Sequence, residues 1–331
     1  MSKHSFGFYR FVSAFVAVVF AVAIASAQMD HGSHGDHAAH TKASAENKVG
    51  VLILAHGGDQ NWNAEVEKAA DAIRKTNPVA VAFGMATKRT IQPAVDSLIK
   101  SGVEEIVAVP LFISSHSSVI TSTEFLLGAR AEAPKALAIF AKMNHGHSGG
   151  DHSGHNMVED PSFDPLTPVE SKVPIKMAAA LDAHPIVAEI LLSRALEISK
   201  DPANEVVILV AHGPVSDEEN QLWLNNMAKL ADEIKAESKF ARIDYLTVRD
   251  DAPKEIRDRA TAELRDTVQK ALNEKRGVLI VPLLLSYGGI EKGIQKRLEG
   301  LDYTMPNHAI LPDERIADWI RLSVASAADK K

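Results

Sequence analysis

The sequence predicts an α/β protein with two similar βαβ lobes, each built on a mainly parallel sheet. Residues 49–57 (VGVLILAHG) match residues 205–213 (EVVILVAHG), and each segment is an apolar run that ends in Ala-His-Gly. Residues 67–73 (EKAADAI) match 228–234 (AKLADEI), and residues 106–114 (IVAVPLFIS) match 278–286 (VLIVPLLLS). Because the three matches occur in the same order, the chain is interpreted as an internal duplication.

The apolar runs predict the strands of these lobes. They are unbroken, which is typical of parallel strands buried on both faces, and segments with helical periodicity such as 63–75 and 254–273 separate them. Ligand sites in such sheets gather at the carboxyl ends of the strands. Both Ala-His-Gly motifs are predicted to lie there.

Composition excludes several classes of function. A chain of 331 residues with 46% hydrophobic content is long enough for two cores. The chain has no cysteine, so disulfides and thiolate metal ligands are excluded. A net charge of −7 argues against a nucleic-acid partner, which requires a basic face.

The first 27 residues predict a signal peptide. Lys3 and Arg10 precede an apolar run at 11–24, and Ala25-Ser26-Ala27 fits cleavage after small residues. We expect an exported chain, periplasmic or extracellular, that begins near Gln28 and does not associate with a membrane after cleavage. The alternative is a retained anchor, although the apolar run is short for a spanning helix.

Two histidine-rich segments divide the rest of the chain. Residues 28–47 contain MDHGSHGDHAAH and are predicted to be a flexible tail, while residues 144–174 contain NHGHSGGDHSGHN and are interpreted as a linker. The predicted lobes are therefore residues 48–143 and 175–331. The histidines favour capture of metal ions, and the alternative is a solvated segment without selected affinity.

Two histidines follow the strands predicted in the first lobe. His56 precedes Gly57, whose small size allows a tight turn and the close approach of a ligand, and His116 follows the run that ends near Ser114. Two imidazoles from adjacent strand ends form a plausible metal site for cobalt, nickel, iron or zinc. Glu124 is a further candidate ligand, and a solvated helix residue is an equal alternative. A histidine hydrogen-bonded within its loop remains the alternative for His56.

These patterns resemble the sirohydrochlorin cobaltochelatases and, more distantly, the class II ferrochelatases, which need no ATP. The resemblance is carried by the strand that ends in Ala-His-Gly, by VPLFISSH at 109–116 and by ALDAHPIVAEILLSRALEIS at 180–199. It implies that the protein inserts a divalent metal, Co²⁺ or else Fe²⁺ or Ni²⁺, into a sirohydrochlorin-like tetrapyrrole without a nucleotide.

The resemblance also assigns roles to individual residues. His56 and His116 are expected to be the catalytic and metal-binding pair, and one of them also accepts a pyrrole proton. Glu124 is the expected third metal ligand. Contacts to the macrocycle are expected from Gly57, Ser114, Ser115 and His212.

The second half departs from this pattern. Tyr287-Gly288-Gly289 stands where a second histidine is expected, so that lobe keeps only His212 and is predicted to cover the substrate. His184, which precedes Pro185, is interpreted as the start of a helix, since proline is favoured in the first turn.

Three functions follow from the sequence. The first is the chelatase, and the second is an exported protein that binds a metal or tetrapyrrole without catalysis. A histidine-dependent phosphatase is disfavoured because Ala55 occupies the place where an arginine would hold phosphate.

Overall fold

The computed structural model describes residues 48–142 and 164–329. The predicted signal peptide (1–27), the histidine-rich tail (28–47) and the first part of the predicted linker (144–163) lie outside the described residues. Within the described ranges, no helix combines the length and the apolar character needed to cross a bilayer.

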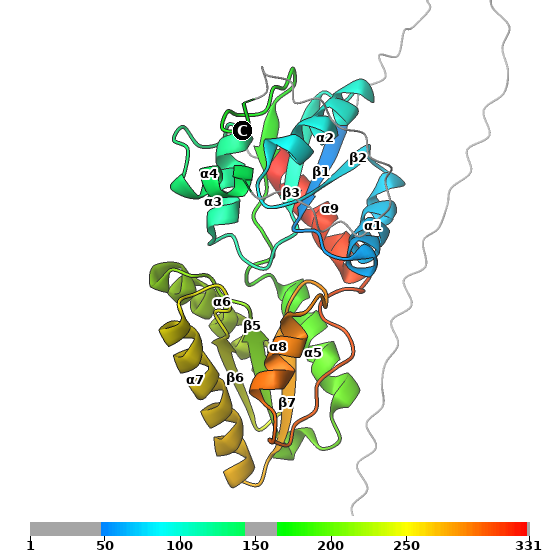
Figure 1. Cartoon of the computed structure of the whole chain (residues 1–331). Helices are drawn as coiled ribbons and strands as arrows, with labels where there is room; N and C mark the ends of the chain where they lie inside the picture. Colours follow the sequence, from blue (N-terminus) through cyan, green and yellow to red (C-terminus); the bar gives the residue numbers. More distant parts are fainter. Residues whose placement is uncertain (1–47, 143–163, 330–331) are drawn as a thin grey trace, which may run out of the picture. The chain divides into compact units, whose positions relative to one another are not determined.

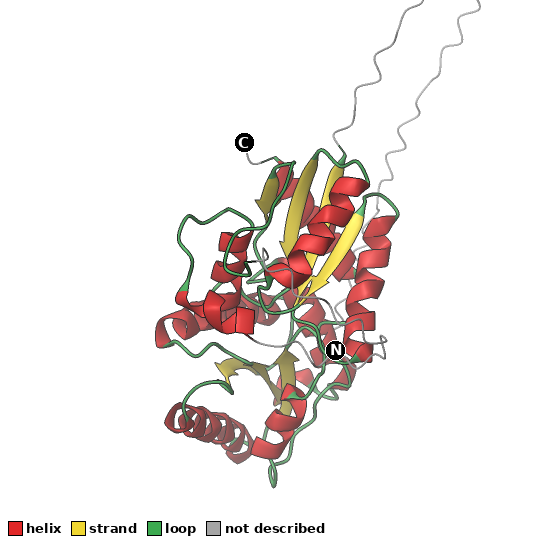
Figure 2. Cartoon of the chain, turned by 45° about the horizontal axis from the view of Figure 1, so that its top comes forward, coloured by secondary structure: helices red, strands yellow, loops and turns green. Residues whose placement is uncertain are grey.

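The first sheet has four parallel strands in the order β2-β1-β3-β4 (Figure 1). Helices lie on both of its faces (Figure 2). The strands are β1 Val49–Ala55, β2 Val79–Phe83, β3 Glu105–Pro110 and β4 Ile175–Met177, and the helices between them are α1 Gln60–Arg74, α2 Lys88–Lys100, α3 Ser118–Leu126 and α4 Lys135–Lys142.

The second sheet has three parallel strands in the order β6-β5-β7. An isolated parallel bridge between Leu279 and Thr304 lies at the outer edge of β7, where the first sheet has β4. The elements of this half are α5 Pro185–Ile198, a 3₁₀ turn Pro202–Asn204, β5 Glu205–Ala211, α6 Asp217–Ala236, β6 Arg242–Thr247, α7 Lys254–Asn273, β7 Gly277–Leu283, α8 Ile290–Arg297 and α9 Arg315–Ala328.

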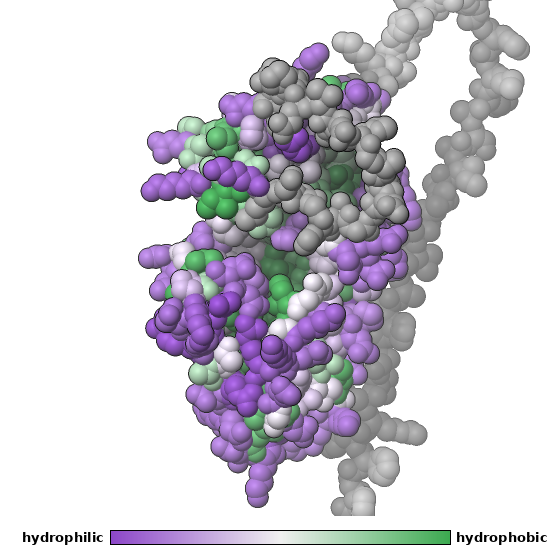
Figure 3. Space-filling view, viewed as in Figure 1, coloured by the Kyte–Doolittle hydropathy of each residue, from purple (hydrophilic) through white to green (hydrophobic). Residues whose placement is uncertain are grey.

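The alternation of side chains along each central strand explains why both of its faces are apolar. In β1, Val51 and Ile53 belong to one buried cluster, and Leu52 and Leu54 belong to another on the opposite face. Successive residues of a strand point to opposite faces, so a strand covered by helices on both sides must be apolar throughout. On the face shown in Figure 3, the surface is mainly hydrophilic, with hydrophobic residues in separate patches.

Strand register confirms the duplicated α/β fold. Leu54 of β1 pairs with Pro110 of β3, and the corresponding Val210 of β5 pairs with Pro282 of β7. The matched sequence segments therefore occupy the same places in the two sheets.

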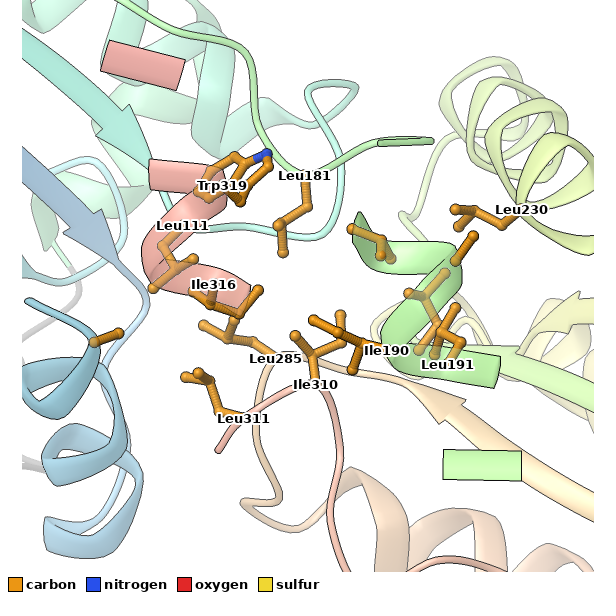
Figure 4. Close-up of a cluster of buried hydrophobic side chains, with 14 of the residues drawn as sticks. Leu111, Leu181, Ile190, Leu191, Leu230, Leu285, Ile310, Leu311, Ile316 and Trp319 are labelled. Atoms are coloured by element: carbon orange, nitrogen blue, oxygen red, sulfur yellow. The ribbon is translucent and has the colours of Figure 1, made fainter. Parts of the chain in front are cut away.

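The two halves exchange a helix. Helix α5 follows β4 of the first sheet but packs against α6 and β7, whereas α9 follows the second sheet and packs against α1, β3 and β4. Figure 4 shows Ile190 and Leu191 of α5 in the same buried region as Ile316 and Trp319 of α9. One hydrophobic cluster thus continues through both halves.

This exchange crosses the predicted lobe ranges 48–143 and 175–331. Strand β4 and helix α9 complete the first lobe, and the end of the predicted linker is held against it. Val169 N donates to Leu126 O (2.8 Å), and Glu170 N donates to Gln92 Oε1 (2.7 Å). The histidine-rich segment therefore precedes the last strand of the first sheet. The three residues of β4 are too few to show a strand pattern in the sequence.

His184 is the N-cap of α5, as the sequence predicted. Its Nδ1 accepts a hydrogen bond from Ile186 N (3.2 Å), and Pro185 occupies the first turn. Burial lowers the pKa of His184 from its ordinary value of 6.5, and the carboxylates of Glu233 and Glu189 oppose this shift only in part. A neutral imidazole is needed here, because protonation of Nδ1 would remove the acceptor.

The stability of the protein should therefore depend on pH through His184. The unfolded chain binds the proton at a higher pH than the folded one, so this contribution is complete above pH 6.5 and is lost as the pH falls below it. His184→Asn keeps a capping acceptor that does not titrate. Between about pH 7.5 and about pH 5, the Tm of the wild type should fall further than that of His184→Asn. Equal falls in the two proteins would contradict this role.

Candidate functional site

His56 lies at the carboxyl end of β1 in a turn that several contacts fix. Gly57 has a φ of +81°, and Gly58 N donates to Asn63 Oδ1 (2.9 Å). His56 is exposed, and its Nδ1 lies 2.6 Å from Gly57 O. Because a carbonyl can only accept, Nδ1 carries the proton, and a neutral ring leaves the lone pair of Nε2 free to bind a metal. Metal-binding histidines are commonly oriented in this way.

His116 lies in the loop that joins β3 to α3. Its N–H donates to Ser114 Oγ (3.1 Å), and the following residue, Ser117, is the N-cap of α3. The side chain of His116 is partly exposed. Since β1 and β3 are neighbouring parallel strands, His56 and His116 leave the same edge of the first sheet, as the sequence predicted.

Asp182 holds the residue before His116. Its carboxylate accepts hydrogen bonds from Ser115 N (2.8 Å), from Ser115 Oγ (2.6 Å) and from Asn226 Nδ2 (3.1 Å) of α6. Ser114 is buried. The two serines predicted to contact a macrocycle thus also fix the loop, and Ser115 alone of the pair lines an open cavity.

That cavity has a volume of about 510 Å³, within the range of roughly 300–1,000 Å³ usual for small-molecule sites. It lies beside α3 and the end of β4. Its walls are formed by Ser115, Ile120, Glu124, Ala129, Arg130, Met177, Ala178 and Ala179.

Glu124, the third ligand predicted for the metal site, lies on the wall of this cavity. Among residues 48–142 and 164–329, no group of three histidine, cysteine or acidic side chains could hold a metal ion. The carboxylate of Glu124 instead lies 3.5 Å from Arg130 Nε. The spacing of eight residues between His116 and Glu124 could not show this, because α3 begins between them and turns Glu124 toward the cavity.

His212 follows β5 at the matching edge of the second sheet. Its Nε2 lies 3.5 Å from Asp251 Oδ2, and that carboxylate is largely exposed, so the pair is weak in water. Gly213, like Gly57, has a positive φ, and the structure therefore repeats the Ala-His-Gly turn in both lobes.

Glu219 was not among the residues predicted from the sequence, yet this residue of the first turn of α6 lies near His116. Burial raises the pKa of Glu219, and the charge of His116 acts in the opposite direction. The carboxylate belongs to the second half of the chain, and only the contact between the halves brings it near the histidine. In the sequence it is one of three consecutive acidic residues at a helix start, a common feature of N-termini.

Comparison with known proteins found a matching family model and similar curated proteins. Residues 50–198 match the family model described as CbiX, and this range includes His56 and His116. A protein from Methanococcoides burtonii named sirohydrochlorin cobaltochelatase is 24% identical over 155 residues, which are 46% of this chain and 97% of the relative.

Two solved structures have a similar fold. SirB from Bacillus subtilis with Fe³⁺ is 16% identical with a TM-score of 0.56, and the match covers 85% of this chain and 96% of that one. SirB from Bacillus subtilis subspecies spizizenii in complex with cobalt is 13% identical with a TM-score of 0.53 and the same coverage. At these identities the likeness shows the fold alone.

The repeated turn yields a test of its close packing. A Cβ at Gly213 would lie 2.5 Å from Thr247 Cβ, whereas a Cβ at Gly102, which also has a positive φ, meets nothing within 4 Å. Gly102→Ala should cost about 1–2 kcal/mol for its backbone conformation. Gly213→Ala should cost about 1–3 kcal/mol more, because the clash adds to the same backbone term. Urea unfolding measures both, and equal losses would show that the turn tolerates a side chain.

Proposed function

We propose that the chain is a tetrapyrrole chelatase and inserts Co²⁺ into a sirohydrochlorin-like tetrapyrrole, because residues 50–198 match the family model described as CbiX and curated sirohydrochlorin cobaltochelatases are similar to this chain. The observation that carries the proposal is that the family match includes two histidines at neighbouring strand ends, one of which has Nε2 free for a metal. Fe²⁺ and Ni²⁺ suit the same imidazole ligands and are the alternative substrates.

The reaction requires that two pyrrole N–H groups lose their protons as the metal enters the ring. A neutral imidazole can deliver the metal or accept a proton, and a carboxylate can accept the second. In this proposal His56 and His116 present the metal, and Glu219 supplies the carboxylate from the opposite half of the chain. Burial raises the pKa of Glu219, so its carboxylate form binds a proton more readily than an exposed glutamate does.

In this proposal the second lobe covers the tetrapyrrole and does not bind a second metal ion. Its loop after β7 carries Tyr287, whose hydroxyl donates to Pro306 O (2.8 Å), and burial raises the pKa of this phenol. The tyrosine is thus tied to its own lobe as a neutral group. His212 is available for contact with the substrate edge.

Insertion can be measured directly with the purified mature protein. Sirohydrochlorin and Co²⁺ are mixed, and the absorption change reports the rate. His56→Ala and His116→Ala should each lower the rate by roughly 10²-fold or more, the usual contribution of a base or ligand at the reacting centre. His308→Ala removes an exposed histidine of the second lobe and should leave the rate unchanged.

The His-rich segments are retained in all these variants, so they cannot explain a difference between them. A wild-type rate equal to that of Co²⁺ and sirohydrochlorin without protein would contradict a chelatase. Equal losses in His56→Ala and His308→Ala would contradict the assigned site.

We also propose that the chain is exported, which the charged start, the apolar run and the small residues of positions 1–27 support. Expression with the native N-terminus in a bacterium should yield a periplasmic product that begins near Gln28. N-terminal sequencing measures this. A cytoplasmic product that retains residues 1–27 would contradict export.

A further inference from the structure

Two tryptophans occupy matching positions in the duplicated halves. When residues 67–73 of α1 are superimposed in sequence on residues 228–234 of α6, Trp62 corresponds to Trp223 and Glu65 corresponds to Asn226. Both tryptophans are buried. Trp223 contacts the loop after β3, and Trp62 contacts the loop after β7. The duplication therefore extends to the contacts between the lobes.

Trp223 contacts His116 itself. Its indole N–H donates to the backbone oxygen of His116 (2.7 Å). One turn further along α6, Asn226 Nδ2 donates to Asp182, whose carboxylate holds both N–H and Oγ of Ser115. Helix α6 of the second half therefore fixes two successive residues of the first-lobe loop.

The reciprocal contact has no histidine. In the alignment of residues 109–114 with 281–286, His116 corresponds to Gly288. A Cβ at Gly288 would lie 3.3 Å from Trp62 Cδ1, and Ser286 Oγ donates to Glu65 of α1. Trp62 thus covers the position where the first lobe carries its histidine. The matching contacts between helix and loop therefore involve a histidine, His116, in the first lobe and a glycine, Gly288, in the second.

We propose that Trp223 is a positioning residue for His116, through which the second lobe sets the location of the metal ligand of the first. The orientation of the peptide unit after His116 helps to set the direction of the Cα–Cβ bond of this residue. A metal site tolerates displacements of its ligand side chains of only about 0.5 Å. A hydrogen bond to the carbonyl of the ligand residue controls that orientation directly. The proposal rests on the proposed function, in which His116 binds the metal.

The test compares Trp223→Phe with Trp62→Phe. Phenylalanine keeps an aromatic ring at each site, and only at position 223 does it remove a donor to His116. Insertion is measured as a function of Co²⁺ concentration. Trp223→Phe should raise the half-saturating Co²⁺ concentration roughly three- to tenfold, as expected for the loss of one hydrogen bond, while kcat falls less. Trp62→Phe should stay within about twofold of the wild type.

A second measurement separates positioning from general destabilisation. Co²⁺ binding without tetrapyrrole is followed by its visible absorption in the wild type, Trp223→Phe, His116→Ala and the double variant, and the contribution of the His-rich segments cancels in the differences. The Trp223→Phe change should weaken Co²⁺ binding when His116 is present, but should have no effect when it is combined with His116→Ala. If Trp223→Phe does not fold, Asn226→Ala should produce the same shift through Asp182 and Ser115.

The outcomes are distinguishable. Equal shifts in Trp223→Phe and Trp62→Phe, an equal effect of Trp223→Phe with and without His116, or an unshifted Asn226→Ala would overturn the positioning role while leaving the chelatase intact. If His116→Ala itself retains wild-type insertion and Co²⁺ binding, the proposed site fails, and the positioning role fails with it.

Discussion

The parallel pairing of β1 with β3 is the constraint on which the rest of the first lobe depends. With Leu54 opposite Pro110, both strands end at one edge, and the loops that carry His56 and His116 must leave from it. Each strand also presents alternate side chains to two apolar clusters, so a shift of one residue would move every side chain to the opposite cluster and disrupt the packing of both. The register that buries the core is therefore the register that brings the histidines to one edge.

The duplicated halves are joined by exchange rather than by simple contact. Helix α5 leaves the first sheet to pack on β7, and α9 returns to pack on β3. The cluster that contains Leu181, Ile310 and Trp319 consequently continues through both halves. The loops at the strand edges are anchored in the same way in each half: Asp182 N donates to Ile113 O, and Leu311 N donates to Leu285 O. Lobes joined in this way can support one site with residues from both.

The site is built asymmetrically on this symmetric frame. Ala-His-Gly turns occur at the corresponding edges of both sheets. In the first lobe the loop after β3 also carries a histidine, His116, whereas the loop after β7 in the second lobe does not. At the corresponding place the second lobe has Gly288, against which Trp62 packs. The second half contributes α6 instead, in which Glu219 lies near His116 and the indole N–H of Trp223 donates to the backbone oxygen of His116. The two halves of the duplicated fold thus differ at the strand edge where the first lobe carries its two histidines.

The sequence by itself determined the α/β class, the duplication, the central strands, the helix start at His184 and the placement of His56 and His116 at strand ends, because periodicity and turn residues are local properties of the chain. It did not determine that α5 and α9 exchange sheets, that β4 belongs to the first sheet, that Glu124 faces Arg130 or that Trp223 reaches His116. These features join residues far apart in the sequence, or depend on how a helix is rotated against its neighbours. Packing of the two halves against one common core decides them, and no local pattern records that choice.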